Sequence, residues 1–317
     1  MIGFDIGGTK CAVCIGEEQD GSLNILKKEV IPTQKDISPY EMIEKMCILA
    51  EGMTDDFRYI GISCGGPLNS KRGIILSPPN LHGWDNVEIS DFLKKRYGGE
   101  VYLQNDANAC AVAEWKYGAG KGTSNMIFLT FGTGMGAGLI LNGRLYSGSC
   151  DMAGEIGHVR LNSCGPVGYG KAGSFEGFCS GNGIAQIGRM FALEKFQHGE
   201  NASYCQSTAE LDKITAKTIA ECAARGCRDA LNVYEMCAEK LGFGLSVLID
   251  ILNPEVIVIG SIYQRAENLL AKKMFEVIDS ESLQASRKIC RIRTKRTRIR
   301  NDNLTSKFSN KSKLSIY

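Results

Sequence analysis

The chain has 317 residues, of which 44% are hydrophobic and 23% are charged, and its formal net charge is +2. These values are typical of an ordinary globular protein with room for one large domain or two medium ones. No run of about 18 uncharged apolar residues is present, and the chain enters a strand pattern at once, without a basic and apolar leader. We therefore expect a cytoplasmic protein without a membrane segment.

Positive charge is concentrated at the end of the chain. Residues 280–317 contain 11 Lys and Arg but 2 Asp and Glu, whereas the remaining residues contain 26 and 33. The body is therefore acidic and the tail basic, and we interpret the two separately.

The 13 cysteines are scattered along the chain. One pair, Cys11 and Cys14, has the Cys-x-x-Cys spacing of redox centres. It falls in a strand pattern, however, which sends the two side chains to opposite faces. We interpret most cysteines as small buried residues in a reducing compartment.

Apolar periodicity predicts a three-stranded meander at the start of the chain, followed by alternating helices and strands. The expected strands lie at 2–5, 10–16, 23–31, 60–63 and 101–104. The expected helices lie at 39–53, 90–97 and 106–117.

The second half of the chain repeats this order. Strands are expected at 126–130, 136–141, 144–147 and 256–259, and helices at 181–195, 207–212, 215–226 and 228–250. A glycine-rich stretch at 118–122 separates the halves. We therefore predict an N-terminal domain at 1–121, a C-terminal domain at 122–290 and a basic tail at 291–317.

Two similar turns, Asp5-Ile6-Gly7-Gly8-Thr9-Lys10 and Phe131-Gly132-Thr133-Gly134-Met135-Gly136, each join an apolar strand to a returning strand. Glycine lets backbone N–H groups approach a phosphate closely, and threonine adds a hydroxyl donor. The repetition predicts two similar half-molecules that grip phosphates on either side of one cleft.

Asp106 lies where a predicted strand ends and a helix begins. Ligands gather at the carboxyl ends of such strands, so its carboxylate could accept a hydroxyl proton during phosphoryl transfer. The alternative is a plain helix N-cap. Other amide, carboxylate and imidazole groups that suit a polyol are Asn80, Asn105, Glu155, His158 and Glu176. A lone histidine such as His158 is also commonly structural.

Several motifs occur together in a fixed order. They are Asp5–Lys10, Gly65-Gly66-Pro67, Pro79–Trp84, Asn105–Asn108, Gly132-Thr133-Gly134, Gly154–His158, and Gly177–Gly181 after Phe175-Glu176. Over about residues 2–262 they resemble the ROK family (repressor, open reading frame, kinase) of sugar kinases and sugar-responsive repressors. The resemblance implies an α/β, actin-like ATPase (ribonuclease H-like) fold with two similar domains around a cleft.

The resemblance also implies ATP-dependent phosphorylation of a hexose or N-acetylhexosamine hydroxyl, with O6 as the expected position and Asp106 as the catalytic base. The residues that it assigns to sugar binding are Gly66, Asn80, Asn105, Asp106, Glu155, His158 and Glu176. Those that it assigns to ATP are Asp5, Gly7, Gly8, Thr9, Lys10, Gly132, Thr133, Gly134 and, near the adenosine, Gly260. Mg²⁺ would accompany the ATP, with Asp5 nearby.

The chain departs from the family where many relatives bind zinc through the histidine equivalent to His158 and three cysteines. The cysteine positions hold Val167, Tyr169 and Ser174 here. A structural zinc site needs about four N or S ligands, so we expect no zinc and no other protein-held metal.

The second departure is the basic run Arg291–Arg300, where family members have a Gly/Ala-rich apolar helix. Three explanations remain open: a frameshifted or degraded terminus, a divergent but folded end, and a disordered basic arm that meets polyanions. Loss of the helix would expose apolar surface, so a non-catalytic sugar sensor or an inactive remnant is the alternative to a kinase.

Family repressors carry a helix-turn-helix segment ahead of the first phosphate turn. Here that turn begins at residue 5, so we expect no DNA binding. The family's tendency to dimerise implies a homodimer, and the expected partner is a small-molecule sugar.

Overall fold

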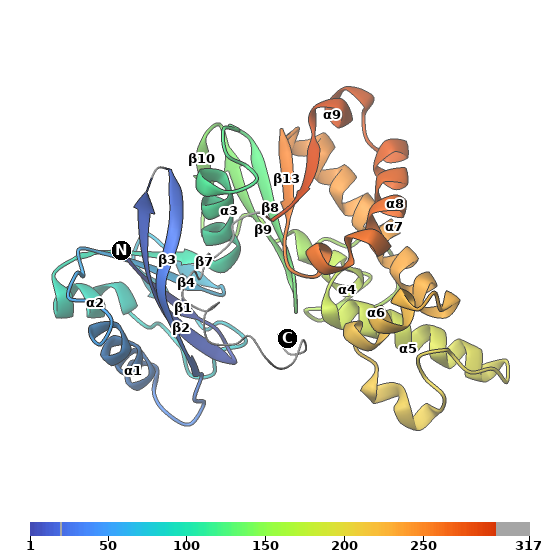
Figure 1. Cartoon of the computed structure of the whole chain (residues 1–317), viewed down its shortest axis with the longest axis horizontal. Helices are drawn as coiled ribbons and strands as arrows, with labels where there is room; N and C mark the ends of the chain where they lie inside the picture. The colour runs from blue at the N-terminus through green and yellow to red at the C-terminus, as the bar shows by residue number, and fades with distance from the viewer. Residues whose placement is uncertain (20, 296–317) are drawn as a thin grey trace, which may run out of the picture. The chain divides into compact units, whose positions relative to one another are not determined.

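The computed structural model describes residues 1–19 and 21–295 (Figure 1). Contacts divide the described chain into two compact units, one formed by residues 1–106 and one that begins at residue 107. Each unit is built on a five-stranded sheet, and the two sheets have the same plan. The sequence-predicted boundary at residue 121 differs from this division by one element, the helix that follows Asp106.

The first sheet has the strand order β3-β2-β1-β4-β7. The strands are β1 (Ile2–Ile6), β2 (Lys10–Gln19), β3 (Ser22–Pro32), β4 (Tyr59–Cys64) and β7 (Glu100–Asn105). The first three form the predicted antiparallel meander, and β1, β4 and β7 run parallel to one another. A separate small hairpin consists of β5 (Leu68–Asn69) and β6 (Ile74–Ile75).

Two helices cover one face of this sheet, α1 (Pro39–Glu51) and α2 (Ile89–Tyr97). α1 begins at a capping box in which Ser38 and Glu41 satisfy each other's backbone N–H groups. Alternate strand residues such as Phe4, Val13 and Ile62 pack against the helices, as the period of two requires.

The second sheet has the strand order β10-β9-β8-β13-β14. The strands are β8 (Met126–Phe131), β9 (Met135–Leu141), β10 (Arg144–Tyr146), β13 (Val256–Ile259) and β14 (Arg291–Thr294). As in the first sheet, three strands form an antiparallel meander and the last two lie parallel to its first strand. This shared topology confirms the predicted two similar α/β domains.

Helices pack on one face of the second sheet around a core that includes Phe131, Phe175 and Tyr234. They are α4 (Phe175–Phe178), α5 (Gly181–Gln197), α6 (Ala216–Ala224), α7 (Arg228–Leu252), α8 (Ile262–Glu281) and α9 (Gln284–Ile289). The long stretch at 150–180 holds a 3₁₀ turn, η1 (Ile156–His158), and a hairpin of β11 (Val167–Gly168) and β12 (Lys171–Ala172). The predicted helix at 207–212 is instead a 3₁₀ turn, η2 (Thr208–Lys213).

β14 corrects the interpretation of the basic tail. Residues 291–317 were expected to form a separate tail, but Arg291–Thr294 pairs with all four residues of β13. An edge strand has one neighbour, so its exposed side chains can be charged without cost to the sheet. Residues 296–317, which contain the rest of the predicted tail, lie outside the described part of the chain. Within the described part, no helix has the length and apolar character needed to cross a membrane.

Helix α3 (Asp106–Tyr117) covers the other face of the second sheet. Ala107 and Ala111 lie directly against Gly138 of β9, where an added Cβ would come within 2.5 Å of the Ala111 Cβ and 2.6 Å of the Ala107 carbonyl oxygen. The helix that starts at Asp106 is therefore anchored to the second sheet by close backbone contact.

This contact predicts that Gly138→Ala destabilises the second unit by about 1–3 kcal/mol, because the added methyl group overpacks a closed interface. The midpoint of urea unfolding should fall. Gly61→Ala in β4 is the matched control, since its new Cβ would have its nearest neighbour, the Ile2 carbonyl oxygen, at 3.9 Å. Equal unfolding midpoints for the two variants would contradict the close packing of α3 against Gly138.

Candidate active site

In the first unit, three parallel strands end at the same level of the sheet. Ile6 of β1 pairs with Cys64 of β4, and Cys64 pairs with Asn105 of β7. The residues that follow these strand ends are the first glycine turn, Gly65-Gly66 and Asp106. The register of the sheet thus gathers three of the predicted motifs on one edge, which is where open α/β sheets bind ligands.

The first turn is held by contacts from two other segments. Thr33 follows β3, and its hydroxyl donates to the Gly7 carbonyl oxygen while its N–H donates to the Thr9 carbonyl oxygen at 3.0 Å. Asn80 lies against Gly8 so closely that a Cβ on this glycine would clash with it. Asn80 therefore belongs to the same edge as the turn. No motif surrounds Thr33, so its supporting role could not be predicted from the sequence.

Asn105 ends β7, and Asp106 follows it on the same edge of the sheet as this turn. The Asn105 Nδ2 atom would be 3.3 Å from a Cβ on Gly66. Burial, and after it the neighbouring carboxylate of Asp106, raises the pKa of the Cys64 thiol, with a smaller contribution from Asp5. Asp5 and Asp106 themselves are exposed.

The second unit has a corresponding edge. β8 leads into Gly132, β13 into Gly260 and β14 into Lys295. Gly181, at the start of α5, donates its N–H to the Gly132 carbonyl oxygen at 2.8 Å. A Cβ on Gly132 would lie 3.4 Å from Ser261 Oγ, so the residue after Gly260 borders the second turn.

Glu176 contacts the second turn directly. Its Oε2 atom accepts the Met135 N–H at 3.0 Å and would lie 2.7 Å from a Cβ on Gly134. The resemblance assigns Glu176 to sugar binding, and its carboxylate also holds the second glycine turn. No local signal predicts a contact between residues 41 positions apart.

η1 begins directly after Glu155 and ends at His158, and its middle residue packs against Glu176. Gly157, between them, lies against the Met135 carbonyl group and would have its Cβ 3.3 Å from that of Glu176. The His158 ring meets the edge of Tyr169 with centroids 6.0 Å apart, and its carbonyl oxygen accepts from Lys171 Nζ at 2.8 Å.

The loop that would carry zinc ligands in relatives is a hairpin in this chain. β11 and β12 are joined by Tyr169 and Gly170, both with positive φ. No group of three or more His, Cys, Asp or Glu side chains in residues 1–19 and 21–295 could hold a metal ion. The side chains around His158 therefore do not fit a zinc site of the family type.

The predicted site residues thus form two sets, one on each sheet edge. The first set contains Asp5, Gly7, Gly8, Thr9, Lys10, Gly66, Asn80, Asn105 and Asp106. The second contains Gly132, Thr133, Gly134, Glu155, His158, Glu176 and Gly260. Each edge combines a glycine turn with amide, carboxylate or imidazole groups.

Comparison with known proteins identifies the family. The ROK family model matches residues 1–303. The chain belongs to the ROK family. The match continues past residue 262, where the motif resemblance ends, and includes β14.

The similar proteins include a kinase and a repressor. A glucokinase from Thermotoga maritima is 33% identical over 85% of this chain and 84% of its own length. A xylose repressor from Caldicellulosiruptor bescii is 30% identical over 86% of this chain but 63% of its own length. The crystal structure of a ROK glucokinase from Streptomyces griseus with glucose and AMPPNP has a TM-score of 0.75 and 27% identity, covering 94% of this chain and 95% of that one.

These likenesses and the two matching sheets confirm the actin-like ATPase fold predicted from the motifs. They leave the individual site residues untested, so the roles of those residues stay predictions.

The Glu176 contact predicts that Glu176→Ala loosens the second turn, because the Met135 N–H loses its acceptor. Hydrogen–deuterium exchange followed by mass spectrometry should show faster exchange in peptides that cover residues 131–137. Glu194→Ala on the exposed side of α5 is the control and should leave these peptides unchanged. Unaltered exchange in the Glu176 variant would show that the turn holds its shape without the carboxylate.

Proposed function

We propose that this protein is a sugar kinase, which transfers the γ-phosphoryl group of ATP to a hydroxyl of a hexose or N-acetylhexosamine, with O6 as the acceptor. The observation that carries the proposal is the register of β1, β4 and β7, which brings the Asp106 carboxylate to the same edge as a phosphate-type turn. The similarity to glucokinases over most of the chain supports the same reaction.

In this mechanism Asp106 accepts the proton of the attacking hydroxyl. The residue is exposed at the first position of α3, so a sugar can reach its carboxylate. α3, the helix that this residue begins, is anchored to the second sheet through Gly138. Proton transfer to a positioned base is worth about 10²–10⁴-fold in rate.

The two glycine turns are proposed to bind the phosphates of ATP. Backbone N–H groups in such turns are fixed dipoles directed at an anion, and Thr9 and Thr133 add exposed hydroxyl donors. Asp5 is the exposed carboxylate beside the first turn that could hold a phosphate-bound Mg²⁺, which when present neutralises part of the phosphate charge.

The sugar is proposed to contact Asn80, Asn105, Glu155, His158 and Glu176. Amide groups both donate and accept hydrogen bonds, and a carboxylate accepts from two hydroxyls, so the set suits several adjacent hydroxyl groups. Because Glu176 also holds Met135, sugar binding and the shape of the second phosphate turn are coupled through one side chain.

The alternative is a sugar sensor without turnover. The 30% identity to a xylose repressor supports it, because that protein is similar over most of the same residues. Retention of Asp106 and of both turns favours the kinase. A single measurement of ADP release distinguishes the kinase from the sensor, since a sensor binds sugar but releases no ADP.

The first test is a coupled ADP-release assay with Mg-ATP and a panel of hexoses and N-acetylhexosamines. Asp106→Asn should lower kcat by about 10²–10⁴-fold while sugar still shifts the melting temperature. The control is Asp91→Asn, which changes another exposed aspartate in the first turn of a helix, α2. This control should keep normal turnover.

The Asp106→Asn variant also distinguishes the two possible roles of Asp106, general base and helix N-cap. Asn caps a helix as well as Asp does, so a capping role alone would leave kcat nearly unchanged. Near-normal turnover in Asp106→Asn would exclude the proposed base. Sugar binding without turnover in the wild-type protein would favour the sensor.

A second prediction concerns His158. His158→Ala should raise the KM for sugar roughly tenfold, since a lost hydrogen bond costs about 1 kcal/mol or more, and should change the KM for ATP little. Tyr169→Phe keeps the ring beside His158 and serves as the control. Equal increases in both KM values would indicate that His158 supports the loop rather than the sugar.

A further inference from the structure

Two cysteines meet at the junction between α6 and α7. α6 ends at Ala224, and the chain turns at Gly226 with φ 82° before α7 begins at Arg228. The Gly226 N–H donates to the Ala223 carbonyl oxygen at 2.9 Å, and the Cys227 N–H donates to the Cys222 carbonyl oxygen at 3.3 Å. These two bonds are those of a Schellman motif, in which the side chains of the two outer residues pack together.

In most proteins this packing contact is made by two apolar side chains, but here both are thiols. The two backbone bonds bring the side chains of these residues to the same side of the turn, and each thiol shifts the pKa of the other. Both cysteines are free, with Cys222 buried and Cys227 half-buried. The backbone bond between the two residues fixes where one lies relative to the other.

The two thiols have different surroundings. The hydrogen bond with Cys222 lowers the pKa of Cys227, and Ser203 and Arg225 add to this effect. Burial is the largest influence on Cys222 and raises its pKa. Cys227 is also the N-cap residue of the 25-residue helix α7, where the helix dipole favours a negative charge. The more exposed sulfur is thus the better nucleophile.

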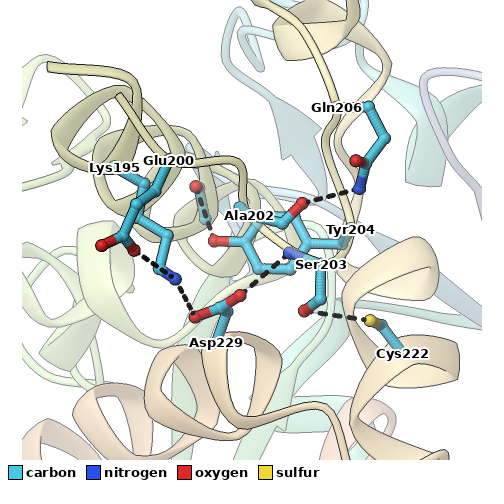
Figure 2. Close-up of polar contacts among 9 residues, drawn as sticks. Lys195, Glu200, Ala202, Ser203, Tyr204, Gln206, Cys222 and Asp229 are labelled. Atoms are coloured by element: carbon cyan, nitrogen blue, oxygen red, sulfur yellow. Dashed lines mark hydrogen bonds and ion pairs between the residues drawn. The ribbon is translucent and has the colours of Figure 1, made fainter. Parts of the chain in front are cut away.

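A polar network holds a hydroxyl group against Cys222 (Figure 2). Ser203 Oγ lies 3.5 Å from Cys222 Sγ, and the Ser203 N–H donates to Asp229 Oδ2 at 2.9 Å. Asp229 Oδ1 in turn binds Lys195 Nζ at 2.9 Å. The loop that carries Ser203 is therefore tied to both α5 and α7, and its hydroxyl stays beside the thiols.

We propose that Cys222 and Cys227 form an oxidisable dithiol, a modification site that closes to an intramolecular disulfide in the presence of a peroxide. The Cys227 thiolate attacks one oxygen of hydrogen peroxide, the O–O bond breaks, and the sulfenic acid of Cys227 and, after protonation, one water form. The Cys222 sulfur then attacks the Cys227 sulfur, the S–O bond breaks, and a second water leaves with the Cys222 proton. Two thiols are oxidised and one peroxide is reduced.

The other cysteines show that both contact and access to solvent matter, whereas sequence spacing does not decide. The Cys179 thiol donates to the Cys237 carbonyl oxygen at 3.4 Å, but both of these residues are 0% exposed. Cys11 and Cys14 are closer in sequence, but both lie in β2, where residues three apart point to opposite faces. Cys150 and Cys164 are exposed but lie outside any comparable pair. These four residues are internal controls for the proposed site.

The experiment is peroxide titration of the reduced full-length protein, followed by thiol blocking and a non-reducing tryptic digest. Arg225 lies between the two cysteines, so trypsin separates residues 218–225 from residues 226–228. A disulfide keeps the two peptides joined, and dithiothreitol releases them. We expect this linked species as the first oxidation product, ahead of any change at Cys150 or Cys164.

Two variants check the order of the steps. Cys227→Ser should abolish the linked peptide and leave Cys222 reduced, and Cys222→Ser should leave a sulfenic acid on Cys227 that dimedone captures. Oxidation of Cys150 or Cys164 before the pair would overturn the proposal. So would conversion of wild-type Cys227 to a sulfinic acid with Cys222 still reduced, or equal formation of the linked peptide in concentrated urea, where the Schellman contact is lost.

Discussion

The parallel pairing of strands in each sheet is the constraint on which the candidate site depends. Ile6, Cys64 and Asn105 end three adjacent strands in register, so the segments that follow them must emerge on one edge. A slip of one residue would turn every side chain of a strand to the opposite face and separate Asp106 from the first turn. The apolar face against α1 and α2 prevents this slip, because it would expose residues such as Phe4 and Ile62.

Much of this arrangement could be predicted from the sequence, because strong local patterns carry it. The meander at the start of the chain, the strand before Asp106 and the helix after it all lie within a residue or a few of their predicted bounds. β14 was missed for a physical reason. Its Arg-Ile-Arg-Thr pattern was interpreted as part of a charge run, but an edge strand tolerates exposed charges because it buries so little side-chain area. α8 was missed although its buried positions, among them Leu270, Met274 and Ile278, have helical spacing.

Contacts between distant segments are the part that local patterns could not supply. Thr33 supports the first turn from the end of β3, and Glu176 supports the second from α4. In neither case does the type of residue alone indicate that it supports a turn. Glu176 also shows the limit of a family resemblance. The resemblance assigns this residue to sugar binding but does not reveal that the same carboxylate accepts the Met135 N–H. The structure therefore adds the links between motifs, whereas the motifs themselves were visible in the sequence.

The two units share a topology but end their fifth strands with opposite charges. In the first sheet β7 is followed by the carboxylate of Asp106, and in the second β14 is followed by Lys295. The Lys295 side chain lies beside Gly260, with its Cδ atom 3.7 Å from a Cβ built there, and its backbone is held by Ile259 and Gln264. A carboxylate suits the acceptance of a hydroxyl proton, whereas an ammonium group suits a phosphate. The shared topology thus carries a carboxylate after the fifth strand of one sheet and an ammonium group after the fifth strand of the other, and β14 places Lys295 beside Gly260.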